Sequence, residues 1–203
     1  MIAAHEALAQ LREGNRRFVA GLASQTPRPA LGQDQQPSAI ILGCSDSRVP
    51  AELVFAQGFG DLFVIRVAGN IAEPSQIGSV EFAATRFGTR LVVVLGHTQC
   101  GAVIATVEEL RHLTPQPSPG LRAIVERIRP AVESLLTTDV GEDSDALVAR
   151  AVRANIRAAA DHLRHGSEIL ERLIAQDGLL VVGAEYCLQT GVVEFFDGVP
   201  EGS

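Results

Sequence analysis

Cysteine is scarce in this chain. Cys44, Cys100 and Cys187 are the three cysteines among its 203 residues. An odd and low count does not fit a disulfide framework, which needs paired cysteines in an oxidising compartment. We therefore expect a cytoplasmic protein, and a reducing compartment also leaves thiolates free to bind a metal ion.

Basic residues are fewer than acidic ones, and long apolar runs and phosphate-binding loops are lacking. The chain has 17 basic against 24 acidic residues, which argues against nucleic-acid binding, because that would need a basic face. No apolar run reaches the roughly 18 residues of a membrane span, and the N-terminus lacks a basic segment followed by an apolar one. No glycine-rich phosphate loop follows a predicted strand. We expect small-molecule substrates, and neither nucleic acid nor a membrane as a partner.

The length and the 46% content of hydrophobic residues predict one domain over residues 1–203. Residues 1–37 are expected to form an N-terminal helix and an extended arm, and residues 38–203 an α/β core. Continuously apolar or alternating runs predict strands, at Ala39–Gly43, Leu62–Val67, Leu91–Leu95, Leu179–Val182 and Val192–Phe196.

Helical periodicity connects these strands. The predicted helices cover residues 3–20, 75–87, 101–112, 121–138 and 144–176, with a kink at Pro130, a break at Gly166 and a loop over 113–120. The last strand follows a Gln-Thr-Gly turn, which predicts a hairpin. The predicted fold class is α/β, with a mostly parallel central sheet, an antiparallel C-terminal edge strand and flanking helices.

Residues that can bind a metal follow the first and the third predicted strands. Cys44, Asp46 and Arg48 belong to the run Cys-Ser-Asp-Ser-Arg, and His97 and Cys100 belong to His-Thr-Gln-Cys. In open α/β sheets, sites form beyond the carboxyl ends of strands, so these runs meet if the two strands are neighbours. Two thiolates and an imidazole favour tetrahedral zinc, and the fourth position is left to Asp46, water or a substrate.

Asp46 has two alternative roles. It can bind the metal and close the site, or it can pair with Arg48 and leave the fourth position open. A bidentate arginine–carboxylate pair has the geometry to hold Asp46 away from the metal. Taken singly, each cysteine is more often a small buried hydrophobe than a ligand. The four residues clustered at the ends of two core strands favour a metal site.

These two runs resemble the paired signatures of the β-class carbonic anhydrases. The likeness extends over nearly the whole chain, at Leu11–Phe18, Gly60–Asn70, Gly78–Phe82, Gly96–Gly101 and Gly183–Tyr186. It implies reversible hydration of CO2 to bicarbonate and a proton by attack of zinc-bound hydroxide, with one Zn2+ per subunit.

The same resemblance implies roles for individual residues. Cys44, His97 and Cys100 would be the zinc ligands, Asp46 and Arg48 the catalytic pair, and Asp46 a fourth ligand in a closed state alone. The expected substrate-binding residues are Gln35, Phe63, Phe82 and Gly101, the last through its backbone N–H. A second subunit would complete the pocket, so a homodimer or homotetramer is expected.

A non-catalytic bicarbonate site of one subclass of that family is matched in part. Arg66 and Tyr186 stand at two of its three side-chain positions, but Ile41 stands where that subclass has tryptophan, and the chain has no tryptophan. Together with Gln35, this departure favours a site that is open at alkaline pH.

Two other functions remain as alternatives. A hydrolase of COS or CS2 could use the same fold and metal, because zinc hydroxide attacks any of these linear electrophiles. A non-catalytic zinc-binding scaffold is the second alternative, although it would have no need of Asp46, Arg48 or Gln35.

Overall fold

The core of the molecule is a twisted sheet with the strand order β2-β1-β3-β4-β5. In the computed structural model, residues 2–20, 35–111, 118–138 and 144–200 are described. Over these residues the strands are β1 (Ala39–Gly43), β2 (Leu62–Arg66), β3 (Leu91–His97), β4 (Leu180–Tyr186) and β5 (Val193–Asp197). Strands β1 to β4 pair in parallel and β5 pairs antiparallel with β4. The predicted fold class is confirmed.

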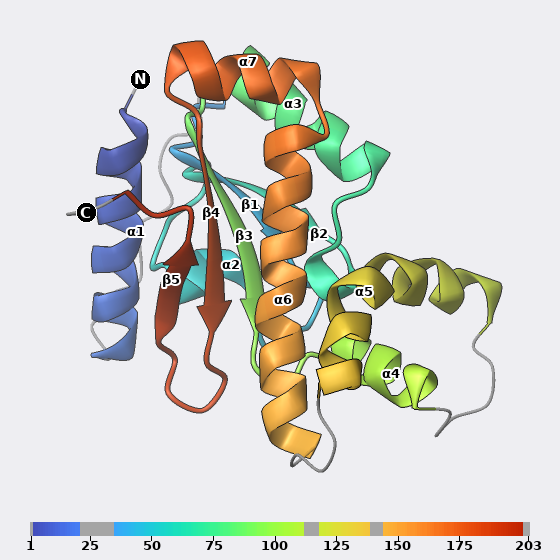
Figure 1. Cartoon of the computed structure of the whole chain (residues 1–203). Helices are drawn as coiled ribbons and strands as arrows, with labels where there is room; N and C mark the ends of the chain where they lie inside the picture. The colour runs from blue at the N-terminus through green and yellow to red at the C-terminus, as the bar shows by residue number, and fades with distance from the viewer. Residues whose placement is uncertain (1, 21–34, 112–117, 139–143, 201–203) are drawn as a thin grey trace.

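Helices cover both faces of this sheet. Figure 1 shows α6 on the near side of the sheet, beside β3, with α2 behind the sheet. The helical elements are α1 (Ala4–Val19), α2 (Ala51–Val54), the 3-10 turn Ala68–Asn70, α3 (Pro74–Arg86), α4 (Gly101–Leu110), α5 (Pro119–Thr138), α6 (Ser144–His165) and α7 (Glu168–Asp177). Alternate strand residues point to opposite faces, so the sheet separates two hydrophobic clusters.

Each cluster belongs to one face of the sheet. Ile40 and Leu42 of β1 pack with α3 to α7, whereas Ala39 and Ile41 pack with α1 and α2. All five residues of β1 and all seven of β3 are buried. Burial on both faces is what the continuously apolar runs predicted.

Several element boundaries differ from the predicted ones. β3 continues for two residues to His97 and β4 continues to Tyr186, because these small or polar residues pair with each other across the ladder. The predicted loop ends earlier, since Pro119 and Gly120 open α5, and proline is favoured in the first helical turn. Pro130 lies inside α5, and the predicted kink there stays a prediction.

Two short elements were not predicted, and one predicted break is confirmed. α2 and the turn Ala68–Asn70 span four and three residues, too few to show a helical period. α6 and α7 are separate helices on either side of Gly166. Most of the predicted arm, residues 21–34, lies outside the described residues. Within the described ranges, no helix combines the length and apolar character needed to cross a membrane.

α1 is anchored to its own chain through a close approach to α2. The Asn15 side chain donates to the carbonyls of Val54 and Gly191 and accepts from the Val193 N–H. A Cβ added at Gly14 would overlap the carbonyl oxygen of Phe55. Glycine is therefore required here by packing.

Replacing Gly14 by alanine tests this packing. In a helix interior, alanine is normally more stabilising than glycine by about 1 kcal/mol. At Gly14 the overlap reverses the sign, and we expect Gly14→Ala to lower the free energy of unfolding by roughly 1–3 kcal/mol. Gly120→Ala in the first turn of α5 is the control, since an added Cβ meets nothing within 4 Å there. Denaturant unfolding measures the free energy of unfolding of both variants and of the wild type. An unchanged or higher value for Gly14→Ala would refute the packing argument.

Candidate metal centre

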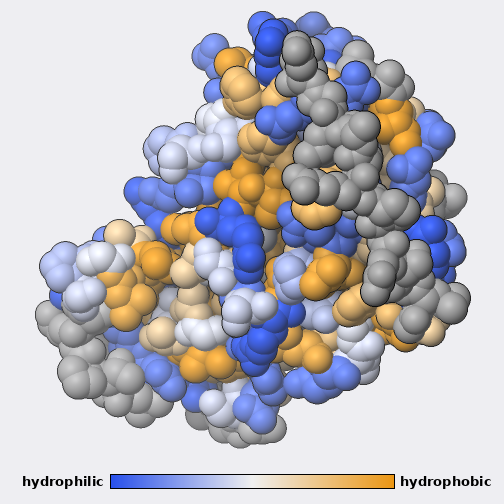
Figure 2. All heavy atoms as spheres, turned by 180° about the vertical axis from the view of Figure 1, so that it is seen from behind, coloured by the Kyte–Doolittle hydropathy of each residue, from blue (hydrophilic) through white to orange (hydrophobic). Residues whose placement is uncertain are grey.

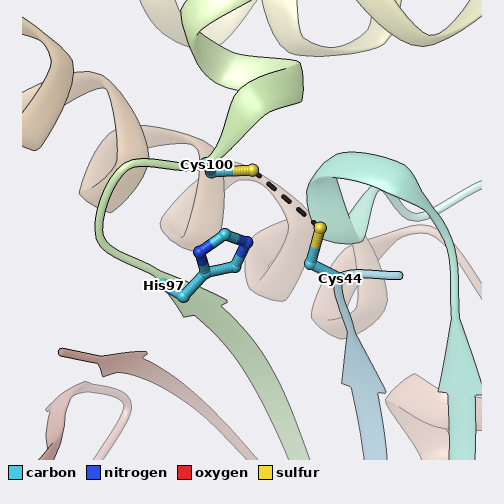
Figure 3. Close-up of side chains that lie close together, drawn as sticks. All are labelled: Cys44, His97 and Cys100. Carbon is cyan, nitrogen blue, oxygen red and sulfur yellow. Dashed lines mark hydrogen bonds between the residues drawn. The ribbon is translucent and has the colours of Figure 1, made fainter. Parts of the chain in front are cut away.

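The three predicted metal ligands meet at the carboxyl edge of the sheet. Cys44 directly follows β1, His97 is the last residue of β3, and Cys100 is the N-cap of α4. β1 and β3 are parallel neighbours, with Gly43 opposite Leu95, so both strands end at this edge. Figure 3 shows the His97 ring at the end of β3, with one ring nitrogen facing the sulfur atoms of Cys44 and Cys100.

The geometry of the group suits one small cation. The Sγ atoms of Cys44 and Cys100 and the imidazole nitrogen of His97 all lie within 4.8 Å of one another. The two sulfur atoms are 3.9 Å apart. The residues are 6%, 0% and 1% exposed in chain order, so water has little access to their ligand atoms.

His97 gives the strongest sign that the group is incomplete without a metal. Its Nδ1 lies 2.9 Å from the Thr98 carbonyl oxygen, and because a carbonyl can only accept, Nδ1 carries the proton and donates. This leaves the lone pair on Nε2, which is buried and has no hydrogen-bond partner. A buried polar atom without a partner costs free energy, and a metal ion on Nε2 would remove that cost. Two thiolates and an imidazole are ligands that zinc accepts.

The two thiols form a hydrogen bond with each other, with 3.9 Å between the sulfur atoms. The hydrogen bond from Cys100 lowers the pKa of the Cys44 thiol, and a backbone N–H from Gly69 acts in the same direction. The same contact with Cys44, together with burial, raises the pKa of Cys100. Both thiols must be deprotonated to bind zinc, so metal binding releases protons here.

Asp46 is held beside this group by Arg48. The Arg48 Nε donates to Asp46 Oδ1 at 2.9 Å and its Nη2 donates to Oδ2 at 2.7 Å, while the Arg48 backbone N–H also bonds Oδ1. These bonds hold the pKa of Asp46 well below its usual range. Oδ2 lies 3.8 Å from His97 Nε2, so an ionised carboxylate borders the open side of the ligand group.

Two further residues shape the loop after β1. Arg66 donates to the carbonyl oxygens of Cys44, at 3.1 Å, and Asp46, at 2.6 Å. Gly69 donates its N–H to Cys44 Sγ at 3.4 Å. The role of Gly69 was not predicted. A glycine after a strand was visible in the sequence, but nothing there indicated that its N–H would reach a sulfur.

The predicted substrate residues are not all at this edge within one chain. Gly101 opens α4 directly after Cys100, so its backbone N–H is at the helix N-terminus. Gln35 is exposed in the segment before β1. Phe63 pairs with Ile40, three residues before the end of β1, which is roughly 10 Å from the edge at about 3.3 Å per residue. Phe63 and Phe82 instead form an aromatic cluster with Phe87.

The residues of the predicted bicarbonate site lie near the carboxyl edge of the sheet and in the cluster beneath it. Tyr186 and Ile41 are buried in the same hydrophobic cluster, and Tyr186 lies opposite His97 in the ladder. Arg66 bonds the loop carbonyls described above. A regulatory role for Arg66 and Tyr186 stays a prediction.

Comparison with known proteins points to one family. Residues 39–193 match the family model described as "Carbonic anhydrase". "Carbonic anhydrase 2" from Mycobacterium tuberculosis is 41% identical over 186 residues, covering 89% of this chain and 87% of that protein. "Carbonic anhydrase" from Mycolicibacterium smegmatis is 39% identical over 190 residues, covering 91% and 89%.

Solved structures share the fold. A tetrameric β-carbonic anhydrase from Sordaria macrospora is similar with a TM-score of 0.75 at 24% identity, over 95% of both chains. The β-carbonic anhydrase CafA from Aspergillus fumigatus is similar with a TM-score of 0.74 at 26% identity, over 96% of this chain and 90% of that one.

Zinc content tests the ligand assignment. Cys44→Ser keeps the size of the side chain but replaces a thiolate by a hydroxyl, which does not ionise near neutral pH. We expect the purified variant to lose stoichiometric zinc, measured by elemental analysis. Cys187→Ser is the matched control, because Cys187 lies outside the ligand group and is half-buried in the connection before β5. Full zinc in Cys44→Ser, or its loss in Cys187→Ser, would contradict the assignment.

Proposed function

The chain belongs to the β-class carbonic anhydrases, which hydrate CO2 reversibly with zinc, and we propose that the residues gathered at the sheet edge perform this reaction. Cys44, His97 and Cys100 hold the metal. The observation that carries the proposal is the buried, partnerless Nε2 of His97 beside two sulfur atoms and an ionised carboxylate. A bound zinc ion supplies Lewis acidity there and lowers the pKa of a coordinated water to about 7.

Asp46 selects and orients what occupies the fourth position. Its Oδ1 already accepts two hydrogen bonds from Arg48, and its Oδ2 accepts one. An ionised carboxylate oxygen can accept more than one hydrogen bond, so Oδ2 keeps a lone pair for a proton-bearing group at the site. A ligand without such a proton would place its own lone pair or negative charge against the negatively charged Oδ2, and the two would repel. Asp46 therefore admits proton donors and turns their remaining lone pairs towards the substrate.

Arg48 keeps Asp46 in this role. The fork of Nε and Nη2 matches both carboxylate oxygens, which a lysine could not do. For Asp46 to become a fourth metal ligand, it would have to give up at least part of this pairing. We infer an open resting state at alkaline pH, where Asp46 stays with Arg48.

Other residues complete the substrate pocket. The Gly101 N–H would donate to a substrate oxygen, since the N-terminus of α4 has unpaired N–H groups and a favourable dipole for negative charge. Gln35, Phe63 and Phe82 would form the remaining wall. In one chain the two phenylalanines lie away from the ligand group, so this wall requires a second subunit.

A homodimer or homotetramer follows from this incomplete pocket. Figure 2 shows apolar residues gathered on the face opposite to that of Figure 1, next to the protruding lobe of α4 and α5. Leu53, Phe59 and Phe82 are 64%, 62% and 52% exposed in the single chain. The β-carbonic anhydrase from Sordaria macrospora, which has a similar fold, is tetrameric. We also propose a cytoplasmic location, because Cys44, Cys100 and Cys187 are all free thiols, as expected in a reducing compartment.

The alternatives receive no support. The matching family and the similar proteins are carbonic anhydrases, and none of them favours a hydrolase of COS or CS2. A scaffold would not require the Asp46–Arg48 pair that the structure contains.

Replacing Asp46 tests its catalytic role. Asp46→Asn keeps the shape but places an amide, which is a weaker acceptor, where Oδ1 and Oδ2 stand. We expect zinc to be retained and CO2 hydration to fall by roughly 10²–10⁴-fold, the usual contribution of a positioned proton acceptor. Stopped-flow measurement with a pH indicator above pH 8 records the rate. Asp161→Asn, an exposed carboxylate on α6, is the control and should keep the full rate. A wild-type rate in Asp46→Asn would contradict the proposed role of Asp46 as a proton acceptor.

Replacing Phe82 tests the second subunit. Phe82→Asp puts a charge on an exposed aromatic, and we expect it to reduce the molar mass in light scattering towards that of the monomer and to lower activity. Leu121→Asp, at a 41% exposed leucine of α5, should change neither. An oligomer that survives Phe82→Asp with full activity would exclude Phe82 from the interface and the pocket.

A further inference from the structure

One buried amide connects the long helix α6 to the metal centre. Asn155, in the middle of α6, is 3% exposed and lies among apolar residues. Its Nδ2 donates to the carbonyl oxygen of Gly69 at 2.8 Å. Burying an amide costs free energy unless it is hydrogen-bonded. The bond to Asn155 therefore holds the Gly69 carbonyl oxygen in place.

Gly69 presents its two polar groups to two different elements. Its carbonyl oxygen accepts from Asn155, and its N–H donates to Cys44 Sγ at 3.4 Å. Its φ is +72°, a conformation that glycine adopts without strain. A Cβ at this position would come within 2.7 Å of Ile128 Cδ1 and 3.1 Å of Ala102 Cβ. The turn is therefore confined by α4 and α5 while Asn155 holds its carbonyl.

Two glycines bring α6 close enough for this contact. A Cβ at Gly96 of β3 would lie 2.5 Å from Ile156 Cδ1, and one at Gly183 of β4 would lie 2.9 Å from Ile156 Cγ2. The residue next to Asn155 thus packs directly on the backbone of both strands. Figure 1 shows α6 running along the sheet beside β3. Because this packing fixes the position of α6 on the sheet, it also places the Asn155 amide within hydrogen-bond distance of Gly69.

We propose that Asn155 is a positioning residue of the zinc site, acting through the peptide groups of Gly69. By holding the Gly69 carbonyl, it keeps the Gly69 N–H directed at the sulfur of Cys44. An N–H bond to a thiolate orients the ligand and withdraws charge from the sulfur, which leaves a bound metal more electron-poor. This inference rests on the assignment of Cys44 as a zinc ligand.

Metal binding by Asn155→Ala tests the inference without using activity. Outer-shell partners typically change metal affinity by 10- to 100-fold. We expect Asn155→Ala to weaken zinc binding by about 10-fold or more in competition with a chromogenic chelator. In the cobalt-substituted protein, the sulfur-to-cobalt charge-transfer band should move to longer wavelength, because a thiolate that has lost an N–H donor gives up electron density more easily.

Asn15→Ala is the matched control. Asn15 is also a buried asparagine whose Nδ2 donates to backbone carbonyls, those of Val54 and Gly191, but it anchors α1 and is not hydrogen-bonded to Gly69 or Cys44. Its replacement should cost stability and leave zinc affinity and the cobalt band unchanged. If Asn155→Ala does not fold, Asn155→Leu, which fills a similar volume without a donor, is judged by the same two measurements.

The outcomes separate this inference from the metal site itself. Wild-type protein that binds no zinc would defeat the ligand assignment. Wild-type protein that binds zinc, with a folded Asn155 variant whose affinity and cobalt band are unchanged, would overturn only the role of Asn155. An equal shift in Asn15→Ala would overturn it as well, because loss of a buried amide would then suffice.

Discussion

The structure depends on three buried ligand atoms whose hydrogen bonding is incomplete. Cys44 and Cys100 form one hydrogen bond at 3.9 Å, and the lone pair of His97 Nε2 has no hydrogen-bond partner. Such a group in a nearly dry environment requires a cation, and two sulfurs with one nitrogen favour zinc. Much of the surrounding architecture brings these atoms together: two parallel neighbouring strands end at one edge, and α4 begins directly after Cys100.

The fourth position is controlled by a competition for Asp46. Arg48 offers that carboxylate three hydrogen bonds, and the pairing holds its pKa far below the usual value, so Asp46 is ionised throughout the neutral and alkaline range. A metal ion would compete for the same oxygens. Arg66 adds a constraint by holding the carbonyls of Cys44 and Asp46, which fixes the loop on which both side chains stand. The geometry favours a carboxylate that borders the site.

The central parts of the fold and the site could be predicted from the sequence. β1 was predicted with its observed bounds, and Cys44, His97 and Cys100 were grouped because each follows a continuously apolar run. The ends of β3 and β4 were missed because Gly96, His97 and residues 183–186 carry no apolar pattern and are strand only through mutual pairing. α2 was missed because its four residues make about one helical turn, in which no apolar pattern can repeat.

The contacts around the metal ligands could not be predicted from the sequence for a different reason. Asn155 is separated from Gly69 by 86 positions, and within an amphipathic helix a single asparagine gives no sign of its partner. Phe63 and Phe82 were assigned to the pocket from the family resemblance, but one chain places them in an aromatic cluster with Phe87. Contacts between elements, and between subunits, depend on packing that local sequence patterns do not encode.

The open arrangement of the metal centre can be seen directly in a crystal structure of the zinc-loaded protein above pH 8. We expect zinc bound by Cys44 Sγ, Cys100 Sγ and His97 Nε2, with Asp46 still paired to Arg48 and absent from the metal. Zinc bound by the Asp46 carboxylate, with the Asp46–Arg48 contact broken, would contradict this open arrangement.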